Sequence, residues 1–225
     1  MQHLRRILIL ILGGSLLASA CTPSTDAPEN PLFLLKSAEE TGLRFENRLQ
    51  STDSANILEY LYYYNGGGVA AGDLDNDGLV DLYFTGNQVP NKVFRNTGGL
   101  KFEDLTAQTG LDGDGGWSTG VTMADVNGDG LMDIYVCNSG SRDQRGNQLY
   151  INQGIKGGVP TFKDQAKEAG LEDGGFSTHA AFFDFDRDGD LDMYLLNNSF
   201  TPIDKLGYTN LREERDKLGG DKLFR

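Results

Sequence analysis

The chain has 225 residues, of which 24% are charged and 38% are hydrophobic, a composition that suits a globular protein. The 33 Asp and Glu outnumber the 20 Lys and Arg, so the formal net charge is −13 at pH 7. This charge argues against nucleic-acid binding, because phosphates need basic partners, and favours a solvated acidic surface or bound cations. Thirty glycines indicate many turns, as in proteins built from short β-strands.

The first 21 residues have the pattern of an export signal. "MQHLRR" is basic, "ILILILGGSLL" is apolar but too short for a comfortable membrane span, and "ASAC" is a small-residue cleavage site that ends at Cys21. A cysteine directly after small residues resembles the bacterial lipobox, although Ala18 stands where leucine is commonest. The resemblance implies that Cys21 is lipidated; the alternative is an ordinary signal peptide in which the cysteine stands by chance.

Residues 1–21 are therefore predicted to be a lipoprotein signal peptide. Residues 22–32 are predicted to be a flexible tether, since "TPSTDAPENP" is rich in Pro, Ser, Thr and acids. We expect an exported protein at a bacterial outer membrane or cell surface, in contact with the membrane through its lipid anchor only. With Cys21 lipidated, Cys137 is the only free thiol and no intrachain disulfide can form.

Beyond residue 33 the sequence repeats itself. Acidic motifs begin at Asp73, Asp125 and Asp184, and self-similarity at a spacing of about 50 residues predicts a repeat architecture. Other segments recur in the same phase: "NKVFRN" at 91–96 with "NQLYIN" at 147–152 and "DKLFR" at 221–225, and "FEDLTAQTGL" at 102–111 with "FKDQAKEAGL" at 162–171.

Each repeat predicts four short strands, of which the first enters the acidic loop and the second leaves it. The second strand is uniformly apolar, so both of its faces should be covered, as they are between the blades of a β-propeller. We predict an all-β fold over residues 33–225, a β-propeller of four-stranded blades. About three blades are present and the ring is expected to be incomplete, as in an N-terminal fragment of a longer protein. The predicted first and second strands are 69–72 and 82–85, 121–124 and 134–137, and 180–183 and 193–196.

The acidic loops have the ligand pattern of calcium sites. Side-chain oxygens stand at loop positions 1, 3, 5 and 9, glycine at position 6 allows a sharp turn, and position 7 would contribute its main-chain carbonyl. The loops contain no His or Cys, which favours calcium over zinc or copper, and magnesium fits a flexible all-protein cage poorly. The predicted ligands are Asp73, Asp75, Asp77, Leu79 and Asp81; Asp125, Asn127, Asp129, Leu131 and Asp133; and Asp184, Asp186, Asp188, Asp190 and Asp192.

These loops are not EF-hands. An EF-hand continues into a helix and places a bidentate Glu at position 12, where this chain has Phe84, Val136 and Leu195 inside apolar strands. A single copy could be a solvated acidic hairpin turn. Three copies in phase favour β-hairpin calcium loops. Asn127 keeps an oxygen ligand in the second loop but removes one negative charge.

The segments "GGGVAAGDLDNDGLVDLYFTGN" and "VFRNTGGLKFEDLTAQTGL", with their later copies, resemble the FG-GAP/VCBS repeats of integrin-type propellers. They are particularly similar to bacterial proteins of the ASPIC/UnbV type and to the related cartilage acidic proteins. The resemblance covers roughly residues 33–225 and implies a calcium-bearing propeller used in adhesion or extracellular binding. The C-terminal module of ASPIC/UnbV proteins is absent from this sequence.

Other groups of residues favour structure over chemistry. Ser177, His179 and Asp184 have the residue types of a catalytic triad, but they lie on one short strand entry where their side chains would not converge. Trp117 and the tyrosines of "YLYYY" at 60–64 could form a sugar-binding platform. Aromatic packing between blades is the preferred interpretation.

Two functions follow from this pattern. The first is a lipid-anchored, calcium-binding extracellular scaffold for adhesion or binding, without catalysis, whose ligand is an extracellular protein or polysaccharide. The alternative is the propeller portion of a secreted carbohydrate-active enzyme such as a polysaccharide lyase. Such an enzyme needs general bases in a cleft, and the mature chain offers one histidine and no converging cluster. The long connection 197–220, with a helical turn between Asn210 and Gly219, is predicted to contribute to a partner surface.

Overall fold

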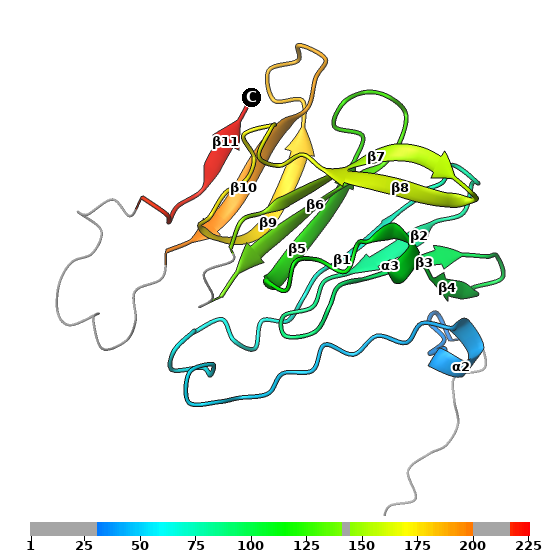
Figure 1. Ribbon diagram of the computed structural model, residues 1–225, viewed down its shortest axis with the longest axis horizontal. Coiled ribbons are helices and arrows are strands. Elements are labelled where there is room, and N and C mark those ends of the chain that lie inside the picture. Colours follow the sequence, from blue (N-terminus) through cyan, green and yellow to red (C-terminus); the bar gives the residue numbers. More distant parts are fainter. Residues whose placement is uncertain (1–30, 141–144, 200–216) are drawn as a thin grey trace, which may run out of the picture. The chain divides into compact units, whose positions relative to one another are not determined.

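The computed structural model describes residues 31–140, 145–199 and 217–225, and Ser37–Arg225 form one compact unit. Within these ranges the strands form three antiparallel sheets in which sequence neighbours pair (Figure 1). The predicted all-β propeller fold is confirmed, and we call the sheets blades 1, 2 and 3. Their strands are β1 (Val69–Gly72), β2 (Asp81–Phe84), β3 (Lys92–Asn96) and β4 (Phe102–Asp104); β5 (Trp117–Ala124), β6 (Asp133–Ser139), β7 (Gln148–Lys156) and β8 (Val159–Asp164); and β9 (Phe176–Phe183), β10 (Asp192–Asn198) and β11 (Lys222–Phe224).

The predicted strands agree with the observed ones in place, with some differences in length. β1 has the predicted bounds, whereas β5 and β9 begin four residues before the predicted starts at 121 and 180. The pairing of β5 with β6 shifts register between Ser118 and Val121, so a bulge separates the early part of β5 from the part that carries the periodic pattern. The bulge conceals the start of the strand from a pattern-based prediction.

Two apolar clusters hold adjacent blades together. One joins Tyr83 and Val93 of blade 1 to Val121 and Ile134 of blade 2, and the other joins the opposite face of blade 2 to blade 3. β6 lies between them and is buried along its whole length, so both of its faces are covered as predicted.

The prediction that both faces of the second strand are covered is wrong for β10. Tyr194 is 37% exposed and Leu196 39% exposed, although their apolar character predicted burial. Among the described residues, only the face of β10 that carries Met193 and Leu195 packs against blade 2. In blade 1, the face that carries Phe84 is partly covered by a segment that precedes β1, because Phe45 stacks on Phe84 with 5.2 Å between ring centroids.

Glycine sets the close approach of the innermost strands. A Cβ on Gly120 of β5 would lie 2.3 Å from the carbonyl oxygen of Thr178 in β9, and one on Gly67 would lie 2.0 Å from the carbonyl oxygen of Thr85. Any side chain at these positions would push the backbones apart.

The segment before β1 supplies a third, aromatic cluster. The ring centroids of Tyr60 and Tyr63 lie 5.6 and 5.2 Å from that of Trp117, and the Tyr60 hydroxyl shares a hydrogen bond of 2.9 Å with Ser139. All three rings are buried. Trp117 is thus packed rather than displayed as a platform, but the rings that contact it come from the chain that leads into blade 1, whereas packing between blades was predicted.

The described residues also form two single-turn helices. α2 (Ala38–Thr41) begins with a capping box, in which Ser37 and Glu40 exchange side-chain to backbone hydrogen bonds, and α3 (Thr106–Thr109) follows β4. No helix in the described part of the chain is long and apolar enough to cross a membrane. The predicted signal peptide, Cys21 and most of the predicted helical turn at 210–219 lie outside the described residues.

Candidate metal centre

Three acidic loops connect the first and second strands of the three blades. We call them loop 1 (73–81, between β1 and β2), loop 2 (125–133, between β5 and β6) and loop 3 (184–192, between β9 and β10). Each leaves its sheet and returns to the adjacent antiparallel strand, so the loops are hairpin connections as predicted.

The aspartate at position 1 closes each loop. In loop 1 the carboxylate of Asp73 accepts from the amides of Asp77 at 3.2 Å and Gly78 at 2.8 Å. In loop 2 Asp125 accepts from Asp129 at 3.0 Å and from Gly130 at 2.8 Å. In loop 3 Asp184 accepts from Arg187 at 2.6 Å and Gly189 at 3.3 Å. The main chain therefore wraps around this carboxylate.

The wrap requires left-handed backbone at two positions of each loop. Position 6 is glycine in all three copies, with φ of 85°, 85° and 97° at Gly78, Gly130 and Gly189. Position 4 is also left-handed, with φ of 56° at Asn76 and 64° at Arg187. Sequence reasoning assigned the glycines but missed position 4, where asparagine in loop 1 and Gly128 in loop 2 were the available signals.

The carboxylates of loop 1 converge on one point. One oxygen from each of Asp73, Asp75 and Asp81 lies within 4.8 Å of the others. Atom Oδ1 of Asp75 is buried and has no hydrogen-bond partner. A buried carboxylate oxygen without a donor is costly, and a cation held by the three carboxylates would supply the missing partner. This oxygen-only donor set fits a calcium ion.

Loop 3 brings together a similar group at a more exposed site. One oxygen each from Asp184, Asp186 and Asp188 lies within 4.8 Å of the others, and all three residues are exposed. The guanidinium of Arg225 forms an ion pair with Asp186. The side-chain hydrogen bond between Asp188 and Asp190 raises the pKa of Asp190.

Loop 2 is arranged differently around Asn127. The amide nitrogen of Asn127 donates to Asp129 at 3.0 Å, and its oxygen accepts from the main chain of the same residue at 3.0 Å. Asn127 thus replaces one carboxylate with a neutral amide that donates a hydrogen bond to Asp129. The described residues of this loop do not bring three carboxylates within 4.8 Å of one another.

The aspartate at position 9 ties loops 1 and 2 to their sheets. In loop 1 Asp81 is 2% exposed, and its two oxygens accept from the amides of Leu74 at 3.0 Å and Asn96 at 2.8 Å. In loop 2 Asp133 accepts in the same way from Val126 at 3.0 Å and Asn152 at 2.8 Å. Sequence reasoning assigned this position only as a ligand and missed its bond to the third strand.

Burial raises the pKa of several of these carboxyl groups. It is the main cause for Asp81 and Asp133, whose backbone hydrogen bonds act in the opposite direction. The pKa of Asp75 is raised by burial and then by the negative charge of Asp77 and Asp73, while a backbone hydrogen bond from Asp77 acts in the opposite direction. Without a cation, burial and mutual repulsion disfavour the ionised form of these carboxyl groups. A bound positive charge would stabilise that form.

Position 7 carries the predicted main-chain ligands, Leu79, Leu131 and Asp190. Each of their amides donates to the carboxylate at position 5, at 2.8, 2.9 and 3.3 Å respectively. These bonds fix the peptide group that precedes the predicted ligand carbonyl. The role of the carbonyl itself stays a prediction.

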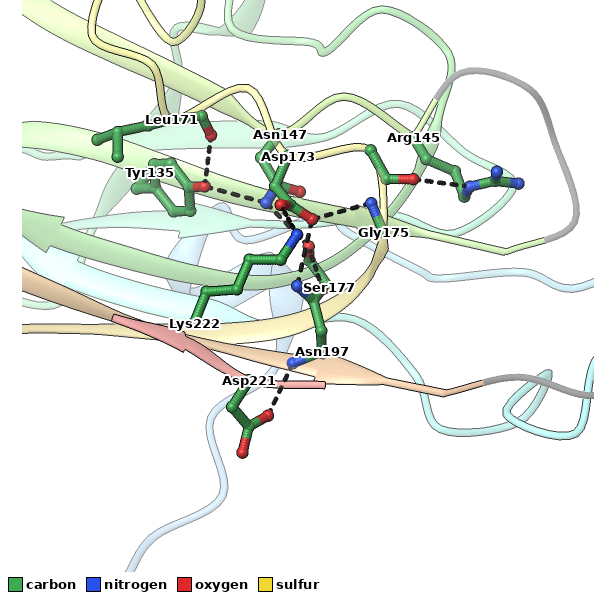
Figure 2. Close-up of polar contacts among 11 residues, drawn as sticks. Tyr135, Arg145, Asn147, Leu171, Asp173, Gly175, Ser177, Asn197, Asp221 and Lys222 are labelled. Atoms are coloured by element: carbon green, nitrogen blue, oxygen red, sulfur yellow. Dashed lines mark hydrogen bonds and ion pairs between the residues drawn. The ribbon is translucent and has the colours of Figure 1, made fainter. Parts of the chain in front are cut away.

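The discarded triad has other partners. Ser177 Oγ donates to Asn197 at 2.8 Å and accepts from Asn147 at 2.9 Å, within a network that joins blades 2 and 3 (Figure 2). His179 is exposed, and Asp184 belongs to loop 3. In the same network Asp173 accepts from Asn197 at 3.2 Å and forms an ion pair with Lys222.

Comparison with known proteins places loops 1 and 2 in a described repeat. The family model for the FG-GAP-like repeat matches residues 73–136, which run from the start of loop 1 through loop 2 into β6. The chain is 30% identical over 138 residues to cartilage acidic protein 1 of Xenopus tropicalis, a match that covers 61% of this chain and 20% of the relative. It is also 30% identical over 158 residues to the Mus musculus protein of the same name, with 69% of this chain and 24% of the relative covered.

The Homo sapiens protein of that name is 29% identical over 158 residues, and 23% of its length is covered. The chain therefore spans about a quarter or less of the curated relatives that it matches. The repeat match and these relatives together indicate a repeat-containing protein. With its three blades and their repeated acidic loops, the chain belongs to the FG-GAP repeat family.

Proposed function

We propose that this chain is a calcium-binding β-propeller module that serves as a non-catalytic scaffold for binding or adhesion outside the cell. In this proposal Cys21 carries the lipid that holds the module to the bacterial outer membrane or cell surface. The ligand is an extracellular protein or a polysaccharide. Calcium keeps the blade edges in the shape that presents a partner surface.

A single observation carries the calcium proposal: the buried Oδ1 atom of Asp75 has no donor and lies in a cluster with Asp73 and Asp81. Native proteins rarely leave a buried carboxylate oxygen unpaired, so its partner should be a group that the chain itself does not supply. All side-chain ligands in the three loops are oxygens. Hard cations prefer oxygen ligands, whereas transition metals prefer nitrogen or sulfur ligands. The wrapped main chain around each position-1 aspartate suits the flexible, many-oxygen cage of calcium.

The expected contribution of calcium to stability is modest at each site. Extracellular calcium modules bind with dissociation constants of about 10⁻⁴ to 10⁻³ M. When free calcium exceeds the dissociation constant about tenfold, one site adds about 1.4 kcal/mol to the free energy of unfolding. Three such sites would matter to a domain with a total stability of about 5–15 kcal/mol.

The scaffold proposal places the partner surface away from the calcium loops. The connections between β2 and β3, between β6 and β7, and between β10 and β11 follow the strand ends opposite the loops and vary most in length. Insertions on one face of a repeat protein are common partner sites. A deletion within 197–220 that leaves partner binding intact would remove this part of the proposal.

The test is a calorimetric calcium titration of the full chain, paired with melting curves in calcium and in chelator. We expect saturable binding near three ions for each chain and a higher melting temperature in calcium. Asp75→Asn should remove one binding event, whereas Asp53→Asn, the same charge change at an exposed site outside the loops, should remove none. A folded chain that binds no calcium would overturn the proposal.

A further inference from the structure

Loops 1 and 2 are joined by one buried side chain. Asn152 of β7 is 1% exposed, and its amide nitrogen donates to the carbonyl of Leu74 in loop 1 at 2.9 Å. The same nitrogen donates to Met132 in loop 2 at 3.1 Å. The main-chain amide of Asn152 donates to Asp133 of loop 2 at 2.8 Å. A single residue of blade 2 thus holds both loops.

The contact on loop 1 lies between two predicted ligands. Leu74 separates Asp73 from Asp75, and its own amide donates to Asp81 at 3.0 Å. Its side chain is 2% exposed and packs in the cluster that joins blades 1 and 2. The peptide groups on both sides of Leu74 are therefore fixed, so a shift of Asn152 would move the carboxylates of loop 1.

We infer that Asn152 is a positioning residue that couples the cation sites of loops 1 and 2, so that an ion in one loop strengthens binding in the other. The inference rests on the calcium binding proposed above. An ion in loop 2 fixes Asp133, which holds the backbone of Asn152, and the side chain of Asn152 then holds Leu74 in the arrangement that loop 1 needs. Because coupling between two binding sites is reciprocal, an ion in loop 1 strengthens binding in loop 2 by the same factor.

Blade 1 contains a matched control for this residue. Asn96 occupies the same place in β3, donates its main-chain amide to Asp81 at 2.8 Å and its side-chain amide to Val80 at 3.0 Å, and accepts from Gly98 at 2.9 Å. These bonds repeat those of Asn152 within its own blade. The described residues show no bond from Asn96 to an acidic loop of another blade, so its loss should spare the coupling.

A second contact also links the two loops. The side-chain amide of Asn76 donates to the carbonyl of Gly130 at 3.2 Å, but this bond is exposed to solvent. An exposed hydrogen bond competes with water, whereas the amide of Asn152 has no such alternative. We therefore assign the main coupling to Asn152.

The test follows calcium binding at each loop separately by nuclear magnetic resonance. The amides of Gly78 and Gly130 donate to the position-1 aspartates of loops 1 and 2, so their resonances report on the two sites individually. Disabling loop 2 with Asp125→Asn and Asp129→Asn should weaken loop 1 about fivefold in the otherwise unchanged chain. In chains with Asn152→Ala, the same change should shift the midpoint of loop 1 less than about twofold. Chains with Asn96→Ala should keep the fivefold effect.

A second measurement needs no change at Asn152. In a chain with loop 1 disabled by Asp73→Asn and Asp77→Asn, calcium in loop 2 should slow hydrogen exchange at the amide of Leu74. Unchanged exchange would overturn the coupling, even if Asn152→Ala prevented folding.

The other outcomes separate this inference from the calcium proposal. If the resonances of both loops respond to calcium but the midpoint of each is independent of the other, the coupling is wrong and calcium binding stands. If the coupling persists in Asn152→Ala, the assignment to Asn152 is wrong. If neither resonance responds in a folded chain, the proposed function itself fails.

Discussion

Asn147 donates its side-chain amide to the hydroxyl of Tyr135, with 3.0 Å between the two atoms, inside the interface of blades 2 and 3 (Figure 2). The hydroxyl in turn donates to the carbonyl of Leu171 at 2.8 Å, in the segment that leads to blade 3. Blade 1 repeats the pair, since Asn91 donates to Tyr83 at 3.1 Å. Blades 1 and 2 thus each carry a buried polar link to the entry of the next blade.

Removal of this link should destabilise the fold. Asn147→Ala leaves the hydroxyl of Tyr135 without its donor. It also leaves the buried main-chain amide of Asn138 without its acceptor, the side-chain oxygen of Asn147 at 2.8 Å. Because each unsatisfied buried group costs about 1–3 kcal/mol, we expect the free energy of unfolding to fall by about 2–4 kcal/mol in urea titrations. Asn65→Ala, a change in an exposed turn, should alter it by less than about 0.5 kcal/mol. Equal losses for the two variants would contradict the assignment.

The glycine at position 6 of the loops should tolerate no side chain. Gly130 has φ of 85° and open space around its Cα, so Gly130→Ala introduces backbone strain without a clash. We expect a loss of about 1–2 kcal/mol in the free energy of unfolding, together with weaker calcium binding. Gly174→Ala is the matched control, because Gly174 also faces open space but lacks the positive φ, and it should be neutral or slightly stabilising. A neutral Gly130→Ala would mean that the loop adopts another turn.

The sequence alone predicted the acidic loops and the strands around them. Alternating aspartates followed by an apolar run fix where β1 ends and where β2 begins to within one residue, since both signals are local. The residue types at positions 1, 3, 5 and 9 likewise indicated which side chains face inward. Asp73, Asp75 and Asp81 do converge.

What the sequence did not predict depends on contacts between distant strands. The bond from Asp133 to the amide of Asn152 requires the register of β7 on β6, which no pattern within either segment encodes. The link from Asn152 to Leu74 requires the packing of two blades. The left-handed backbone at Arg187 was missed because its residue type disfavours that conformation. Exposure of Tyr194 was missed because its sequence pattern matches that of the buried tyrosines.

The thiol of Cys137 should be inert in the native chain. Cys137 is fully buried in β6, and burial raises the pKa of its thiol well above the ordinary range, so almost no thiolate forms at neutral pH. In a chain with Cys21→Ser, which leaves Cys137 as the single thiol, we expect no reaction with a disulfide reagent until denaturant is added. Rapid labelling of the folded chain would show that β6 opens readily, which its packing between two clusters argues against.

The contribution of Asp75 to the stability of the calcium-free chain should rise as the pH falls from neutral. Asp75 has its pKa raised in the folded state by burial and by Asp77 and Asp73. A raised carboxyl pKa means that the folded chain binds protons more readily than the unfolded chain, so this group favours folding below its unfolded pKa of about 3.9 and loses that effect as the pH rises through its folded pKa.

Asp75→Asn isolates this contribution from groups with the opposite trend, such as Asp104, whose pKa is lowered by hydrogen bonds from Lys92 and Thr106 despite its partial burial. In chelator at pH 7 the variant should be at least as stable as the parent chain, and the difference should shrink as the pH approaches 4. In calcium the order should reverse, because the variant lacks a ligand and the parent carboxylate is neutralised by the ion. Denaturant titrations at several pH values, with and without calcium, measure both effects. A parent chain that is the more stable of the two in chelator at pH 7 would show that Asp75 is satisfied without an ion, and the calcium assignment of loop 1 would lose its main support.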